Sequence, residues 1–310
     1  MKYTNNALNI LIAKTYKGIG KAWIVKNVKG HESDEQLLAL INGSLKDQIV
    51  TLDELIVRKK KCADFLEKMS GFADGVTVWG DPDFPPSRGN VKNSEQPVTL
   101  FYRGNLDLVQ SSSQNIAVIG VLSPDPHTET KERQLVTHLV KAGVCVVSGL
   151  AQGCDAIAHD QTLNCHGKTV AILPSPLSNI LPAVNKPLAD KIVASGGLLL
   201  SEYYDEPKAK MELNGRYQER DRLQALFSDA IILASSYAKN DLGNDSGSRL
   251  AMGYALAYGI QRAVMYDEHE DANNPKYDLN RQILAEPDKP LKLTSDLGDS
   301  VVSLLKIRPT

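Results

Sequence analysis

The sequence predicts an α/β protein: a doubly wound, mostly parallel, Rossmann-like sheet with a small N-terminal helical domain. Three observations predict this fold class. From residue 115 onward, short apolar runs alternate with helical segments. Before residue 75, apolar residues recur at helical spacing and show no strand-like alternation. Finally, 310 residues with 42% hydrophobic content can bury a large core and a smaller second one.

Residues 1–75 are expected to form the helical domain. Helical periodicity covers Ala7–Tyr16, Ser33–Asn42 and Leu52–Met69. The stretch Lys17-Gly18-Ile19-Gly20-Lys21 resembles a helix-hairpin-helix turn, whose backbone amides can contact a phosphate. A lone G-x-G is a weak signal, so we favour a plain turn between two packed helices.

Residues 76–100 are expected to be a linker or a segment that wraps over the surface. Three prolines lie between Pro82 and Pro86, which excludes a helix or a central strand there. The apolar stretch Val98–Arg103 then predicts a short strand that leads into the sheet.

Residues 101–270 are expected to form the extended Rossmann-like domain, and residues 271–310 a C-terminal extension with a short helix at Ser300–Leu305. Continuous apolar strands between helices are typical of a parallel sheet covered on both faces. The expected strands are Ile116–Ile119, Val144–Val147, Val170–Leu173, Leu198–Leu200, Ala230–Leu233 and Ala263–Met265. The expected helices are Thr130–Lys141, Asp155–Asn164, Lys186–Ala194, Arg220–Phe227 and Ser248–Tyr258.

Composition and charge exclude several classes of protein. A formal net charge of -2 and a pI near 6.3 exclude a globally basic nucleic-acid coat, yet they allow a local basic groove. The four cysteines show no zinc-ligand spacing, and no apolar run approaches the ~18 residues of a membrane span. The N-terminus has no secretory signal pattern. We therefore expect a cytoplasmic protein that uses no metal or cofactor and contacts no membrane.

The most informative motif is Ser148-Gly149-Leu150-Ala151-Gln152-Gly153, which ends an apolar strand and precedes a helix. Amides at a helix N-terminus, placed at the carboxyl end of a parallel strand, bind phosphate groups in open α/β folds. Gly149 and Gly153 would permit positive φ and close backbone approach, and Gln152 could donate a hydrogen bond. We expect Asp155 to cap the helix and His159 to be buried and hydrogen-bonded rather than catalytic.

Other candidate phosphate-binding residues follow along the chain. Lys186 stands near a helix start, although a lone lysine is usually solvated surface. Ser246-Gly247-Ser248-Arg249 precedes the last predicted helix of the sheet domain and favours either an anion-binding nest or a simple N-cap. The turn at Gly120-Val121-Leu122 matches neither the dinucleotide fingerprint nor a P-loop.

Three arginines, Arg216, Arg220 and Arg222, lie within seven positions. Arginine side chains suit bidentate phosphate recognition. The interleaved Glu219 and Asp221 equally favour an ion-pair network on a solvated helix. The residues alone leave both interpretations open.

Several ordered motifs resemble the DprA/Smf (DNA-processing protein A) family. They are Phe84-Pro85, Phe101–Leu106, Ser148–His159, Leu199–Tyr203, Arg220-x-Arg222 and Ser246-Gly247-Ser248. The resemblance implies a non-catalytic homodimer that binds single-stranded DNA and helps to load a RecA-type recombinase during transformation. It implies that Lys186, Arg216, Arg220, Arg222 and Arg249 meet the DNA backbone, while the Gly149–Gly153 and Ser246–Ser248 turns supply amides.

The sequence also departs from the family pattern. Gly120-Val121-Leu122 stands where the family has Gly-Ser-Arg, and Gln218–Arg222 replaces Pro-Arg-Arg-Asn-Arg. The winged helix of some members is not expected. Losing cations and gaining anions weakens backbone binding, which favours an alternative: a sensor of a nucleotide ligand in the same pocket, in antiviral defence. A phosphoribohydrolase is disfavoured, because Ser246–Arg249 replaces the Pro-Gly-Gly-x-Gly-Thr loop of those enzymes.

Overall fold

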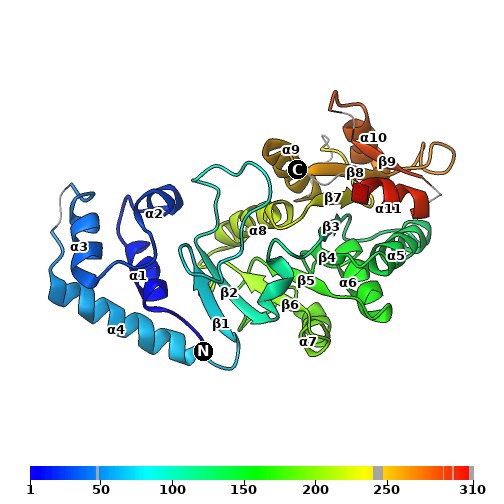
Figure 1. Ribbon diagram of the computed structural model, residues 1–310. Helices are drawn as coiled ribbons and strands as arrows, with labels where there is room; N and C mark the ends of the chain where they lie inside the picture. The colour runs from blue at the N-terminus through cyan, green and yellow to red at the C-terminus, as the bar shows by residue number, and fades with distance from the viewer. Residues whose placement is uncertain (47–48, 240–246, 289, 295–296, 307–310) are drawn as a thin grey trace.

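The computed structural model describes residues 1–46, 49–239, 247–288, 290–294 and 297–306. In this part of the chain a nine-stranded sheet carries helices on both faces, and four further helices gather beside one end of it (Figure 1). The predicted α/β fold with an N-terminal helical region is confirmed.

The sheet has the strand order β1-β2-β6-β5-β4-β3-β7-β8-β9. Its strands are β1 (Gly75–Val78), β2 (Thr99–Gly104), β3 (Asn115–Ile119), β4 (Cys145–Ser148), β5 (Thr169–Leu173), β6 (Leu198–Ser201), β7 (Ala230–Leu233), β8 (Gln261–Met265) and β9 (Leu291–Leu293). From β6 to β9 every neighbouring pair is parallel, whereas β1 and β2 are antiparallel additions at one edge. The six strands predicted from the apolar runs correspond to β3–β8.

Nine of the eleven helices in the described residues lie where the sequence predicts them, with shifted ends, whereas those at Lys21–Asn27 and Asp278–Leu284 were not predicted. The helices are α1 (Asn5–Ala13), α2 (Lys21–Asn27), α3 (Asp34–Asn42), α4 (Leu52–Lys68), α5 (Pro126–Lys141), α6 (Cys154–Asn164), α7 (Lys186–Ala194), α8 (Lys210–Leu226), α9 (Gly247–Tyr258), α10 (Asp278–Leu284) and α11 (Leu297–Lys306). The largest difference is α8, which begins ten residues before the predicted Arg220.

The chain winds in both directions from β3. Strands β4, β5 and β6 extend the sheet to one side, and β7 then returns to pair with the other side of β3. Two apolar cores cover the two faces of these strands, one around Val147 and Leu233 and the other around Val118 and Val146. In such a sheet, the point where the winding reverses, at the carboxyl ends of β3 and β7, is the usual place of a ligand site.

Two strands were not predicted. Residues 76–78, expected in the linker, lie in β1, which pairs with β2 from Gly75 opposite Tyr102 to Val78 opposite Thr99. At the other edge, β9 pairs with β8. Both are short edge strands whose apolar residues are too few to give a periodic signal. The proposed division of the chain into domains stays a prediction.

Three of the four N-terminal helices, α1, α3 and α4, begin at side-chain caps. Thr4 accepts a hydrogen bond from the backbone of Ala7, and Ser33 and Thr51 each form a capping box. One continuous apolar core contains Ile10 of α1 together with Phe101 of β2 and further sheet residues. The helical region therefore packs directly against the sheet.

The turn at residues 14–20 joins α1 to α2, and Gly18 there has φ of +91°. Lys21, the first residue of α2, directs its Nζ to Glu219 of α8 at 2.7 Å and to Glu202 after β6 at 3.4 Å. This lysine thus links the helical region to the sheet. Whether the turn contacts a phosphate stays a prediction.

No helix in the described part of the chain is long and apolar enough to cross a membrane. All four cysteines are unpaired thiols, and burial raises the pKa of Cys145 to about 12 and that of Cys62 to about 11.

Candidate nucleic-acid interface

Three turns meet at the carboxyl ends of β3, β4 and β7. The Ser248 hydroxyl at the start of α9 donates to the carbonyl of Gly120 after β3, at 3.3 Å. The backbone N–H of Cys154 at the start of α6 donates to the carbonyl of Val121 at 3.1 Å. A side chain on Gly153 would collide with the backbone of Val121 and Leu122. The convergence brings together motifs that lie more than a hundred residues apart in the chain.

The β4–α6 turn is held by Asp155. Its Oδ2 accepts hydrogen bonds from the backbone N–H groups of Gly149 at 3.2 Å and Ala151 at 3.3 Å. The prediction that Asp155 caps α6 was wrong, because Gly153 occupies the N-cap position. Two of the amides expected to be available for a phosphate are therefore already engaged by a carboxylate.

Other members of this turn also differ from expectation. Positive φ occurs at Leu150 (58°) and Gly153 (74°), whereas glycine at residue 149 permits the close approach of Arg220. Ser148 is fully buried, and its hydroxyl donates to the carbonyl of Val118 at 2.7 Å. Gln152 is therefore the only exposed residue of this motif, and Ser148 belongs to the buried interior.

The three arginines of α8 are buried. Arg216, Arg220 and Arg222 are only 4%, 6% and 1% exposed. This part of α8 is not a solvated face, because it packs against α9 and the ends of the strands. The ion-pair interpretation is the one that the structure shows, and the predicted contact of these guanidinium groups with DNA phosphates stays a prediction.

Each arginine has its own carboxylate partners. Arg216 contacts Glu212 at 2.6 Å and Asp205 at 3.1 Å. Arg222 contacts Glu202 at 2.5 Å. These pairs fix α8 to the segment that follows β6.

Arg220 stands at the centre of the site. It lies 3.3 Å from Asp155 of the β4–α6 turn and 3.3 Å from Asp221 of its own helix. Burial raises the pKa of Asp221 to about 7, an effect that the charge of Arg220 opposes and that of Asp155 reinforces. A Cβ at Gly247 would come within 2.7 Å of Asp221 Oδ2, so glycine lets α9 approach this cluster closely. The cluster thereby joins the turns after β4 and β7.

The remaining predicted residues are placed as follows. Lys186, the first residue of α7, is 63% exposed and lies 2.7 Å from Asp190. Ser248 is buried, and Arg249 in the first turn of α9 is half-buried. Ser246 lies outside the described residues. Lys186 is therefore at the rim of the site, not within the central cluster.

His159 is fully buried in α6, as predicted. Its Nδ1 lies 2.7 Å from the hydroxyl of Thr169 on β5. Burial, together with the nearby charge of Arg220, lowers the pKa of His159 to about 3. The imidazole is thus neutral at physiological pH and belongs to the interior of the protein.

Asn185 is a residue that the motifs did not single out. Its Nδ2 donates to the carbonyl of Leu150 at 2.8 Å and to that of Ala151 at 3.1 Å. These bonds tie the start of α7 to the β4–α6 turn. No local pattern predicts them, because the partners lie 35 and 34 residues earlier in the chain.

A polar cluster fixes the turn after β3 from outside. Asp125 caps α5 by accepting from the backbone of Thr128 at 2.8 Å, and it also accepts from Asn274 Nδ2 at 3.1 Å. Lys276 Nζ donates to the carbonyl of Ser123 at 2.7 Å. The segment after β8 thus holds the β3–α5 turn in place.

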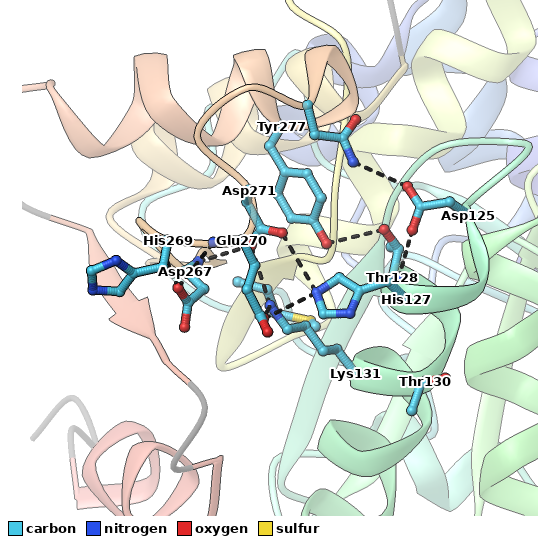
Figure 2. Close-up of polar contacts among 12 residues, drawn as sticks. Asp125, His127, Thr128, Thr130, Lys131, Asp267, His269, Glu270, Asp271 and Tyr277 are labelled. Carbon is cyan, nitrogen blue, oxygen red and sulfur yellow. Dashed lines mark hydrogen bonds and ion pairs between the residues drawn. The ribbon is translucent and has the colours of Figure 1, made fainter.

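Figure 2 shows how this segment lies over α5. His127 and Lys131 on one face of the helix point toward Glu270, at 3.2 and 2.9 Å, and the nearly buried Asp271 lies beside them. Within the described residues no group of three or more His, Cys, Asp or Glu side chains has an arrangement that could hold a metal ion. The cluster serves to fasten the loop to the helix.

A family model described as "DNA recombination-mediator protein A" matches residues 75–291, well over half of the chain. The chain belongs to this family, which is also called DprA/Smf. The matched range contains all three turns of the site and the arginines of α8. The resemblance inferred from the motifs is therefore confirmed.

Individual family members agree with this assignment. The chain is 35% identical to Smf of Synechocystis over 162 residues, which are 52% of this chain and 39% of that protein. It is 33% identical to DprA of Streptococcus pneumoniae over 142 residues, 46% of this chain and 48% of that protein. These alignments span about half or less of the relatives' lengths.

Two solved DprA structures share the fold. The structure from Streptococcus pneumoniae has a TM-score of 0.71 at 23% identity and covers 98% of both chains. The structure from Helicobacter pylori, whose title concerns its single-stranded DNA binding mode, has a TM-score of 0.56 at 25% identity. It covers 73% of this chain and 99% of that one.

Proposed function

We propose that this protein binds single-stranded DNA in DNA processing, helps to load a RecA-type recombinase and catalyses no reaction itself. The observation that carries the proposal is the convergence of the turns after β3, β4 and β7 at the point where the sheet winding reverses, within the range that matches the family. The Helicobacter pylori relative, described as binding single-stranded DNA, supports the same ligand class.

The DNA backbone is proposed to pass over the exposed rim of the site. Gln152, Lys186 and the first turn of α9 around Arg249 would contact phosphate groups there. The buried arginines of α8 would act indirectly, because their ion pairs hold the turns that form the rim. This division differs from the direct contacts that the family resemblance implies.

The absence of catalysis is supported by how the polar groups are used. Asp155 is engaged by two backbone amides and by Arg220. His159 is buried, neutral and paired with Thr169. Neither group is positioned to transfer a proton to or from a ligand at the rim.

A titration of the protein against a labelled oligonucleotide at two salt concentrations tests the proposal. We expect binding at low salt that weakens as salt increases, because phosphate contacts release counterions. Double-stranded DNA of the same length serves as the comparison. No binding of single strands even at low salt would refute the proposal.

One observation favours the alternative of a nucleotide sensor. Leu122 is 64% exposed in the turn where the family resemblance places a phosphate-binding arginine. A thermal-shift screen with mono- and dinucleotides distinguishes the two functions, because a ligand that binds only the folded state raises its melting temperature. Stabilisation by a nucleotide, without binding of oligonucleotides, would favour the sensor.

The proposed partners have their own tests. We propose a homodimer, supported by exposed Leu256 on α9 and Val302 on α11, each about half accessible. Light scattering coupled to size-exclusion chromatography would report twice the 33.9 kDa chain mass.

Recombinase loading would appear as faster filament formation on DNA covered by a single-strand-binding protein.

A further inference from the structure

A cavity of about 260 Å³ lies between the N-terminal helices and the sheet domain, away from the convergence of the three turns. Its walls are apolar: Leu11 and Ile12 of α1, Cys62 and Phe65 of α4, and Tyr204 after β6. In Figure 1, α1 and α4 lie side by side at the end of the molecule that carries the N-terminus. Nothing in the proposed function above uses this cavity.

The helix α4 presents a distinct face to the cavity. Arg58, Lys61, Cys62 and Phe65 follow one another at spacings of three, one and three residues, so they share one side of the helix. Leu55 and Leu66 are fully buried in the apolar core instead. Two cations at the mouth and an aromatic ring inside therefore come from the same helix face.

The four consecutive basic residues of α4 have different surroundings. Of the four consecutive cations from Arg58 to Lys61, Lys59 is buried and paired with Asp34, with a further contact to Asn5 Oδ1 at 3.2 Å. Lys60 is exposed and does not line the cavity. Arg58 and Lys61 are exposed at its mouth; Arg58 donates to Thr15 Oγ1 at 3.1 Å and lies over the Tyr16 ring, and neither cation has an ion pair with a carboxylate among the described residues.

Two aromatic rings line the cavity. The Phe65 and Tyr204 rings meet edge to face with centroids 5.2 Å apart, and both are only half-buried. Since a cavity of about 150 Å³ can hold benzene, this one has room for a nucleobase.

We propose that this cavity receives one unstacked base of a bound single strand, while Arg58 and Lys61 contact the phosphates beside it. This inference rests on the proposed function, since it names a second contact region for the same ligand. Stacking on aromatic rings with flanking cations is the general way in which proteins hold single strands without sequence preference. An aliphatic side chain of a partner protein would fill the apolar walls but would leave the two cations without a counterpart.

The experiment compares two twelve-nucleotide strands, oligothymidylate and a strand of abasic sites with the same number of phosphates. Tyr204→Ala should weaken binding of oligothymidylate about tenfold and leave binding of the abasic strand within about twofold. Tyr204→Phe keeps the ring and should bind both strands like the wild type. Circular dichroism and melting temperature establish that each variant is folded.

Lys61→Ala tests the phosphate contact, and Lys60→Ala is its matched control on the same helix. Lys61→Ala should reduce the slope of log affinity against log salt by about 0.7, the value for one phosphate contact of a single strand, and Lys60→Ala should leave it unchanged. A single 5-iodouracil in the strand should cross-link on irradiation to a peptide that contains Phe65 or Tyr204.

The outcomes separate the two proposals. If the wild type binds oligothymidylate and folded Tyr204→Ala binds it equally well, the cavity does not hold a base, and the proposed function stands. The same conclusion follows if Tyr204→Ala loses only its association with a recombinase, which would make the cavity a protein docking site. If the wild type binds neither strand, both proposals are overturned.

Discussion

The guanidinium group of Arg220 occupies the space that any side chain at residue 149 would need. A Cβ built on Gly149 would overlap Arg220 Nη1 and would also approach Asp155 Oδ2 to 2.7 Å. Glycine at this position is therefore required by a residue of α8 that lies 71 positions later in the chain, and not by a left-handed backbone.

Gly149→Ala should lower the free energy of unfolding by about 3 kcal/mol. The added methyl group must displace a buried arginine whose ion pairs have little room to adjust. Urea denaturation measures the change. Gly215→Ala in α8, where no atom lies within 4 Å of the new Cβ, is the control and should stabilise the protein by up to about 1 kcal/mol. Equal effects of the two substitutions would contradict the packing described here.

Arg220→Met should destabilise the protein by about 3–5 kcal/mol. The substitution leaves the carboxylates of Asp155 and Asp221 buried without their cation. Arg103→Met provides the comparison, because Arg103 forms an exposed pair with Asp190 and should change stability by less than about 1 kcal/mol. If Arg220→Met retained wild-type stability and only lost DNA affinity, Arg220 would be a direct phosphate ligand.

His159 should contribute a loss of stability as the pH decreases from about 6.5 toward 3, opposite in sign to the contribution of Asp221, whose folded-state pKa of about 7 lies above its unfolded value. The pKa of His159 is about 3 in the folded protein and about 6.5 when unfolded, so the unfolded chain binds the extra proton in this window. The contribution of His159 is complete above pH 6.5 and disappears as the pH drops through the folded-state value.

His159→Gln removes this titrating group. Urea denaturation at pH 7, 6 and 5 should show that the free energy of unfolding of the wild type decreases relative to that of the variant, whatever their difference at pH 7. Parallel pH profiles would mean that folding does not change the pKa of His159.

Lys186→Ala should reduce the salt dependence of single-strand binding and leave stability within about 0.5 kcal/mol. Lys186 is exposed at the rim of the site, and its contact with Asp190 is a surface pair of little energetic weight. Lys191→Ala, near the other end of α7, is the matched control and should not alter the salt slope. An unchanged slope for Lys186→Ala would remove this residue from the proposed interface.

Much of the sheet could be predicted because its signal is local. The strands β3–β8 are buried on both faces and therefore appear in the sequence as short continuous apolar runs. The intervening helices bury one side each, so their apolar residues recur at helical spacing. The short edge strand β9 was not predicted, because Leu291–Leu293 becomes a strand only by pairing with β8.

By itself, the sequence determined the fold class, the six central strands, the turn motif after β4 and the family. Only the tertiary structure showed that the arginines of α8 are buried in ion pairs. The local pattern of Arg220, Asp221 and Arg222 is equally compatible with a phosphate-binding surface and with ion pairs. The choice depends on Asp155, 65 residues before Arg220, and on Glu202, 20 residues before Arg222. Burial and charge pairing are properties of contacts between distant segments, and the spacing of neighbouring residues does not encode them.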